Sequence, residues 1–177
     1  MASAGPTTPG PEEELTTAGP PEGSDNANVL IRPPIALVLA AAGALAATWL
    51  YPLPFLPARI PAGWLGAAVF ALGLALLGWS VATMRRAGTR FETNQPSTRI
   101  VSTGPYRFVR NPIYVGMFLA LTALAIGIDS LWPLIALAPF YLVIRYGVVA
   151  REEAYLERKF GDAYLDYKAK VRRWGLV

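Results

Sequence analysis

The chain has 177 residues, of which 54% are hydrophobic and only 16% are charged. Soluble domains carry about a quarter charged residues, so this composition leaves little water-facing surface. The sequence holds no histidine and no cysteine. Those absences exclude serine–histidine and cysteine–histidine nucleophiles, disulfides, and thiolate or imidazole metal sites. Chemistry here must therefore use Arg, Glu, Asp, Tyr, Asn and backbone groups, or be supplied by a cofactor.

The first 30 residues differ in character from the rest of the chain. They are rich in Pro, Gly, Thr and Ala, and they carry five acidic side chains and no basic one. Such a segment buries too little apolar area to offset its ordering entropy, so we expect residues 1–30 to be a disordered acidic tail. Residues 31–177, with 16 basic and 7 acidic side chains, form the predicted membrane domain.

Four long apolar stretches follow, and each predicts a helix that crosses a membrane. Charge-free gaps of 26 and 25 residues separate Arg32, Arg59 and Arg85, and gaps of 18 and 15 residues flank Asp129. A helix needs about 20 apolar residues to cross a bilayer, or fewer where the bilayer is thin. We expect transmembrane helices near residues 34–50, 63–84, 112–128 and 131–150. The predicted fold class is an all-α integral membrane protein with a C-terminal helical hairpin and a cytoplasmic amphipathic tail.

The arginines predict the orientation of the chain. Six arginines and one acidic residue lie in residues 85–110, whereas the first connection holds only Arg59 and the hairpin tip only Asp129. Positive charge favours the cytoplasmic side, so we expect both termini in the cytoplasm. We interpret the basic excess as topology and contact with membrane lipids, with no role for nucleic acid. The richness in Ala, Gly, Pro and Arg is typical of a GC-rich bacterial genome, so we expect the protein in a bacterial plasma membrane.

Small residues recur along the second apolar stretch. Gly66, Gly73 and Gly78 stand in the run GAAVFALGLALLG, residues 66–78, whose other members are Ala, Val, Phe and Leu. Glycines let helices approach one another closely inside a membrane. We therefore interpret this run as a face that packs against a neighbouring helix.

The third apolar stretch begins with the segment GPYRFVRNPIYVG, residues 104–116. Asn111 and Pro112 predict an N-cap and a first helical position, with the Asn111 amide oxygen accepting an orphan backbone N–H. The helix start would then lie beside Arg107 and Arg110. Unpaired N–H groups, the helix dipole and two arginines together favour an anionic group at this point.

Aromatic and small residues flank that helix start. Tyr106 and Tyr114 offer flat surfaces against which a heterocycle can pack. Gly116 admits the close approach of a ligand or of a neighbouring helix. The alternative interpretation is a capped helix beside an ordinary interfacial belt of aromatic and arginine residues.

A second polar group lies at the end of the fourth apolar stretch. Arg145 and Glu152 are seven residues apart, almost two helical turns, so both are predicted to face the same groove. Glu153 follows directly, and the alternative for the two glutamates is a solvated surface pair. Gly161 predicts a helix stop and Asp162 a restart. The helix after Asp162 is expected to lie on the membrane or to fold back over the mouth of the bundle.

The order of these motifs resembles the isoprenylcysteine carboxyl methyltransferase family and its phospholipid methyltransferase relatives. The shared motifs are G-P-Y, R-x-P-x-Y-x-G, E-E-x-x-L and F-G-x-x-Y-x-x-Y, with a hydrophobic hairpin between the second and the third. The resemblance implies a membrane enzyme that binds S-adenosylmethionine between its last two transmembrane helices and its cytoplasmic tail. It also implies a methyl acceptor that enters from the lipid.

The motif positions carry the implied cofactor site onto nine residues of this chain: Tyr106, Arg110, Asn111, Pro112, Tyr114, Gly116, Glu152, Glu153 and Tyr164. Many members of the family have histidine where this chain has Asn111. An amide donates and accepts hydrogen bonds but carries no proton near neutral pH. A mechanism that requires an imidazole base is therefore excluded.

Methyl transfer from a sulfonium depends mainly on the orientation of donor and acceptor. Glutamates suit a positively charged donor, and Arg110 or the helix start suits the cofactor carboxylate. Arg145 is the predicted catalytic residue that places a carboxylate acceptor. Glu152 or Glu153 is the predicted base if the acceptor is instead an amine or a thiol.

The expected partners are membrane lipids and an amphiphilic small-molecule or lipid acceptor, and the oligomeric state is left open. Two alternatives belong to other classes. A sterol-reductase-like membrane enzyme shares the R-x-P-x-Y hairpin but uses a nicotinamide cofactor, and the E-E and F-G-x-x-Y-x-x-Y motifs argue against it. A non-catalytic membrane scaffold of the same fold finds its best support in Asn111.

Overall fold

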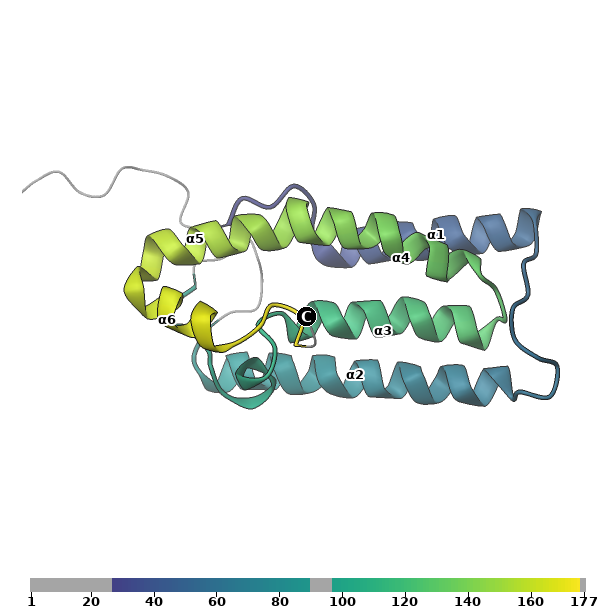
Figure 1. Ribbon diagram of the computed structural model, residues 1–177, viewed down its shortest axis with the longest axis horizontal. Coiled ribbons are helices and arrows are strands. Elements are labelled where there is room, and N and C mark those ends of the chain that lie inside the picture. Colours follow the sequence, from purple (N-terminus) through teal and green to yellow (C-terminus); the bar gives the residue numbers. More distant parts are fainter. Residues whose placement is uncertain (1–26, 90–96, 176–177) are drawn as a thin grey trace, which may run out of the picture.

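The computed structural model describes residues 27–89 and 97–175, and all regular secondary structure in these residues is helical. The long helices run alongside one another as a bundle (Figure 1). The elements are α1 (Pro33–Leu50), α2 (Ala62–Arg86), η2 (Gly104–Arg107), α3 (Pro112–Gly127), α4 (Trp132–Leu142), η3 (Val143–Val149), α5 (Ala150–Phe160) and α6 (Asp162–Lys170). The predicted all-α class is confirmed.

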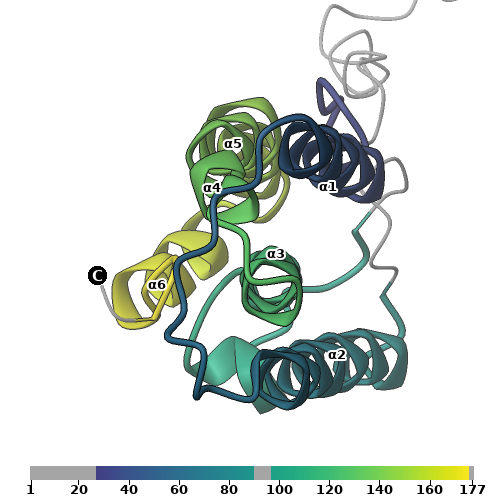
Figure 2. The ribbon, with the colours of Figure 1, turned by 90° about the vertical axis from the view of Figure 1, so that its right-hand side faces the viewer.

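Within the described residues, three helical stretches are long and apolar enough to cross a membrane: α1, α2, and the continuous rod of α4, η3 and α5 over Trp132–Phe160. The fourth apolar helix, α3, has 16 residues and spans about 24 Å at about 1.5 Å per residue. Viewed end-on, α3 lies between α1, α2 and the rod (Figure 2). Leu121 and Ala125 of α3 are fully buried. The neighbours thus shield the short helix, and the protein is an integral membrane protein.

The contact between α2 and α3 is made by glycines. A Cβ on Gly66 would lie 2.6 Å from the Gly127 Cα, and a Cβ on Gly73 would lie 3.1 Å from the Gly116 carbonyl oxygen. Neither position admits a larger residue without moving backbone. The predicted packing face is therefore confirmed at Gly66 and Gly73, but Gly78 faces open space.

The fourth predicted helix continues past its expected end at residue 150. The rod remains helical to Phe160, passing through a π-helical segment at Val143–Val149. Between Leu142 and Phe160 the sequence has no proline, and the chain first turns away at Gly161, where φ is 53° and ψ is −131°. A left-handed φ of this kind suits glycine, which explains both the predicted stop and the restart as α6.

Residues 27–30 belong to the folded domain rather than to the predicted disordered tail. The Leu30 N–H donates to the Gly147 carbonyl at 3.1 Å. The Asn28 carbonyl accepts from the Arg151 Nη1 at 2.9 Å. These contacts fix the approach to α1 against the rod, while residues 1–26 lie outside the described residues.

Candidate functional site

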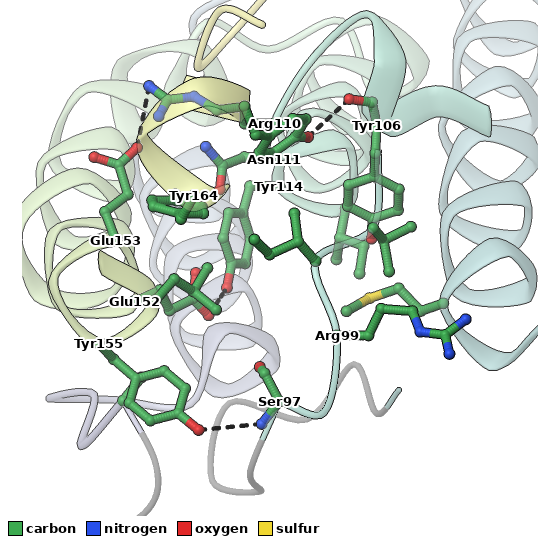
Figure 3. A pocket seen from close by; sticks show the side chains of 17 residues that line it. Ser97, Arg99, Tyr106, Arg110, Asn111, Tyr114, Glu152, Glu153, Tyr155 and Tyr164 are labelled. Carbon is green, nitrogen blue, oxygen red and sulfur yellow. Dashed lines mark hydrogen bonds and ion pairs between the residues drawn. The ribbon is translucent and has the colours of Figure 1, made fainter. Parts of the chain in front are cut away.

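A pocket lies at the end of the bundle that carries α5 and α6, between the start of α3 and α5 (Figure 3). We call it the α3–α5 pocket. Seven of the nine predicted cofactor residues line it: Tyr106, Arg110, Asn111, Tyr114, Glu152, Glu153 and Tyr164. They come from η2, the start of α3, α5 and α6, segments that the helical hairpin and the turn at Gly161 bring together.

Pro112 opens α3 as predicted, but Asn111 does not cap it with its side chain. No side-chain cap bond is made at the start of α3. The Asn111 amide instead donates from Nδ2 to the Arg173 carbonyl at 3.2 Å. The Arg110 N–H likewise donates to the Arg172 carbonyl at 2.9 Å. The amide is thus used to hold the segment after α6 against the start of α3, which corrects the predicted cap.

Glu152 is held by a phenol from the neighbouring helix. The Tyr114 hydroxyl donates to the Glu152 Oε1 at 2.7 Å, and Tyr114 itself is buried (Figure 3). Tyr114 lies in the first turn of α3 and Glu152 in the first turn of α5. The bond therefore fixes one carboxylate oxygen and leaves the other available to a ligand in the pocket.

Glu153 is shared by two guanidinium groups. The Arg173 Nε and Nη2 donate to its two carboxylate oxygens at 2.8 and 2.6 Å. The Arg110 Nη2 lies 3.3 Å from the Glu153 Oε1. Because it bonds to this carboxylate, the pKa of Arg173 is raised, and the pair stays charged. Two cations against one anion leave a local surplus of positive charge at Arg110.

Arg110 and Tyr106 hold buried donors without partners. Within the described residues, the Arg110 Nε and Nη1 and the Tyr106 hydroxyl make no hydrogen bond, although all three atoms are buried. Only 8% of the Arg110 side chain is exposed. Burial raises the pKa of Tyr106, so its hydroxyl stays a neutral donor. Buried polar groups are almost always paired, so unpaired donors in a pocket wall indicate a place for an acceptor from a ligand.

Tyrosines form much of one wall. The Tyr167 hydroxyl donates to the Tyr106 carbonyl at 2.7 Å, and the Tyr164 and Tyr167 ring centroids are 6.1 Å apart. Burial raises the pKa of Tyr164 to about 12. These rings offer neutral, flat surfaces against which a heterocycle can stack.

The enclosed part of the α3–α5 pocket is about 130 Å³. Small-molecule sites usually hold roughly 300–1,000 Å³. A nucleoside-sized ligand therefore requires part of the wall to move outward. At Ser97 the wall is held by a hydrogen bond of 3.2 Å from the Ser97 N–H to the Tyr155 hydroxyl, and the next residue, Thr98, bonds to Gly88 and Thr89.

Three predicted site residues do not line the pocket. Gly116 faces α2, where a Cβ would lie 3.1 Å from the Gly73 carbonyl oxygen. Pro112 is fully buried at the start of α3 and serves the geometry of the helix. Arg145 lies with its guanidinium 5.2 Å from the centre of the Tyr146 ring.

The displacement of Arg145 has a physical cause in the rod. The predicted alignment of Arg145 with Glu152 assumed α-helical spacing, in which seven residues make almost two turns. Residues 143–149 are instead π-helical, with more residues in each turn. The same seven residues therefore stop well short of two turns, and the two side chains point to different sides.

Sequence reasoning missed several lining residues. Ser97, Arg99 and Tyr155 line the pocket, as does Tyr167. Tyr167 is the last position of the F-G-x-x-Y-x-x-Y motif and could have been found from it. Ser97 and Arg99 lie in an irregular connection with no local pattern, so only the fold reveals their place.

Comparison with known proteins agrees with the motifs. The family model described as phospholipid methyltransferase matches residues 61–163, which include most of the pocket residues. An uncharacterized protein of Haemophilus influenzae is 44% identical over 62 residues, 35% of this chain and 98% of that protein. The nickel-cobalt-cadmium resistance protein NccN of Alcaligenes xylosoxydans xylosoxydans is 31% identical over 109 residues, 61% of this chain and 50% of that protein. No solved structure matches the chain significantly.

The family match covers more than half of the chain, from the start of α2 into α6. It confirms the resemblance that the four ordered motifs indicate. The chain belongs to the phospholipid methyltransferase family of membrane methyltransferases.

Proposed function

We propose that this protein transfers a methyl group from S-adenosylmethionine to an amphiphilic or lipid-like acceptor at the membrane face where the α3–α5 pocket lies. The observation that carries the proposal is the buried Arg110, whose Nε and Nη1 have no partner in the described residues. It lines the same pocket as Glu152 and the unpartnered Tyr106 hydroxyl. This arrangement supports a ligand with both an anionic and a cationic end.

The residues present fit the two ends of S-adenosylmethionine. Arg110 would bind the carboxylate through a charge-assisted hydrogen bond from one of its unpartnered atoms, Nε or Nη1. Glu152, positioned by Tyr114, would face the cationic part. Tyr106, Tyr164 and Tyr167 would pack the adenine. When bound, this cofactor supplies a methyl group on a positively charged sulfur.

Glu153 has a different task in this proposal. Its two oxygens already bond to Arg173, so it positions Arg110 and holds the segment after α6 in place. Glu152 has the more available carboxylate of the two. If the acceptor is an amine or a thiol, Glu152 is the group placed to accept its proton at Oε2.

A carboxylate acceptor would need a cation to place it rather than a base. The structure sets Arg145 against the Tyr146 ring and away from the pocket lining. Arg99 lines the pocket and takes over that role in the proposal. The apolar lining residues Ile100, Val101 and Leu156 would accommodate the hydrophobic part of an amphiphile.

The relative NccN carries a name that refers to metal resistance. This chain has no histidine and no cysteine, and its described residues hold no group of three acidic side chains suited to a metal ion. No observation therefore favours metal binding as a second function. The two alternative functions, a nicotinamide-dependent reductase and a non-catalytic scaffold, concern the same pocket and are distinguished by the experiment below.

The experiment uses the full chain purified in detergent and S-adenosylmethionine carrying a labelled methyl group. Glu152→Gln should lower cofactor binding and methyl transfer to a total lipid extract, while Asp166→Asn, which removes an exposed carboxylate on α6, should leave both unchanged. Preferential binding of a nicotinamide dinucleotide would favour the reductase alternative. Absence of cofactor binding by the wild type, or equal binding by wild type and Glu152→Gln, would refute the proposal.

A further inference from the structure

A second pocket lies at the same end of the bundle, on the other side of the connection that precedes η2. It holds about 400 Å³ between the last turns of α2 and residues 99–104. Its walls include Trp79, Thr83, Arg86, Arg99, Ser102 and Thr103. We call it the α2-end pocket, and neither the family match nor the proposed methyl transfer assigns it a role.

The α2-end pocket is lined by donors and cations. Arg86 and Arg99 are exposed, and so are Ser102 and Thr103. Among the described residues that line it there is no acidic side chain. Guanidinium groups with nearby hydroxyls suit phosphate oxygens, which accept several hydrogen bonds at once.

The pocket continues along α2 into an apolar surface. Arg86, Trp79 and Leu72 follow at intervals of seven residues, almost two turns, so they lie along one side of the helix. Trp79 and Leu72 are 50% and 60% exposed. From the end of α2 toward its middle, the exposed groups are thus the guanidinium of Arg86, the indole of Trp79 and the aliphatic chain of Leu72. Tryptophan marks the membrane–water interface, which sets Arg86 at headgroup depth and Leu72 among the acyl chains.

The close fit of the loop over α2 depends on Gly104. Its φ is +56°, and a Cβ at this position would lie 2.6 Å from the Thr83 Oγ1 and 3.3 Å from the Trp79 Nε1. The glycine lets residues 99–104 approach α2 and form the far wall of the pocket. The pocket is therefore part of the fold.

We propose that the α2-end pocket binds the phosphate of an anionic phospholipid, with the acyl chains running along α2 past Leu72. A zwitterionic headgroup would bring an ammonium among arginines, where no carboxylate of the lining receives it. An anionic headgroup meets two guanidinium groups and several hydroxyls and, among the described lining residues, no carboxylate. The α2-end pocket shares Arg99 with the α3–α5 pocket, where that residue also has a role in the proposed methyl transfer, but Arg86, Ser102 and Thr103 belong to the α2-end pocket alone.

The test uses the full chain in detergent, with retained lipid measured by native mass spectrometry. Phosphatidylglycerol and phosphatidylcholine with identical acyl chains are supplied in equal amounts. The wild type should retain the anionic lipid about tenfold better, since basic residues near a membrane attract anionic headgroups. The double variant Arg86→Gln with Arg99→Gln should lose this preference. The variant Arg158→Gln, which removes an exposed arginine on α5, should keep it.

A second arm adds inorganic phosphate at millimolar concentration. Phosphate alone should displace little of the retained phosphatidylglycerol, because it does not occupy the apolar surface of α2 at Trp79 and Leu72. Full displacement would show a site for a free anion and would overturn the lipid proposal. Equal retention of both lipids by the wild type would overturn it too, as would an equal loss of preference in Arg158→Gln.

Discussion

The two ends of the bundle use their polar residues in opposite ways. At the end that holds the hairpin tip, the Asp129 Oδ1 accepts from the Phe55 and Leu56 N–H groups at 3.0 and 2.8 Å. The Thr48 and Ser130 hydroxyls bond to each other at 2.7 Å. At the other end, Arg110 and Tyr106 keep buried donors without partners in the described residues. At the hairpin tip, which we call the closed end, these polar groups bond to other groups of the chain. At the end that carries the α3–α5 pocket, which we call the open end, some buried donors are left for a ligand.

The comparison predicts that substitutions at the two ends affect different properties. A change at the closed end should lower stability and leave binding intact. A change at the open end should remove binding and leave stability nearly intact, since a buried donor without a partner contributes little to folding.

Arg110→Gln should have the largest effect on function. The guanidinium charge and its hydrogen bond to the cofactor carboxylate are lost, which predicts a fall in cofactor affinity of about a hundredfold. Equilibrium binding of labelled S-adenosylmethionine to the purified protein measures it. The midpoint of thermal unfolding in detergent should change little, because Glu153 keeps both bonds to Arg173. A fall in affinity below fivefold would contradict the role given to Arg110.

Asp129→Ala should have the largest effect on stability. Two N–H groups lose a charged acceptor, and alanine tolerates the left-handed φ of 46° less well than aspartate. The expected loss is about 2–3 kcal/mol of unfolding free energy, seen as a lower thermal midpoint. Asp129→Asn, which keeps an acceptor and suits this φ, should recover most of the loss. Both variants should keep the cofactor affinity of the wild type, in contrast to Arg110→Gln.

Tyr114→Phe should have an intermediate effect. It removes the hydroxyl that positions the Glu152 Oε1 at 2.7 Å and leaves the ring in place. Losing one hydrogen bond to a charged group predicts a fall in methyl transfer of about tenfold. A rate assay on the variant measures it, with Tyr146→Phe, an exposed tyrosine of the same rod, as the control. Equal rates for the two variants would show that Tyr114 does not position Glu152 for the reaction.

Arg145→Gln should have the smallest effect. Its guanidinium lies against the Tyr146 ring and outside the pocket lining, so cofactor binding and methyl transfer should change by less than about twofold. A tenfold loss would restore the catalytic role predicted from the sequence. The same transfer assay decides between these outcomes.

Much of the fold follows from the distribution of charges. The charge-free gaps predicted α1, α2 and α3 to within two residues at each end, because a helix in lipid must exclude charge along its whole length. Pro112 and Gly161 marked a helix start and a helix stop, since each residue restricts or frees the backbone in a known way.

The site was less accessible to sequence reasoning because its contacts are long-range. Arg173 bonds to Glu153 from twenty residues away and leaves Glu152 to the pocket, and no local spacing signals that choice. The Asn111 side chain serves the segment after α6 instead of its own helix. Gly116 was predicted for a ligand or a helix, and only the placement of α2 shows that it faces Gly73.

The number of residues in the π-helical segment at Val143–Val149 determines the direction in which the side chains of α5 point. A π turn holds one more residue than an α turn, so removing a single residue between these positions would let ordinary α-helical bonding resume. Everything beyond it would then rotate by roughly 100° about the rod axis. The glutamate pair would swing away from Tyr114 while every side chain kept its identity. The one extra residue in the π-helical segment thus sets the rotation of α5 about the rod axis and turns Glu152 toward Tyr114 of α3.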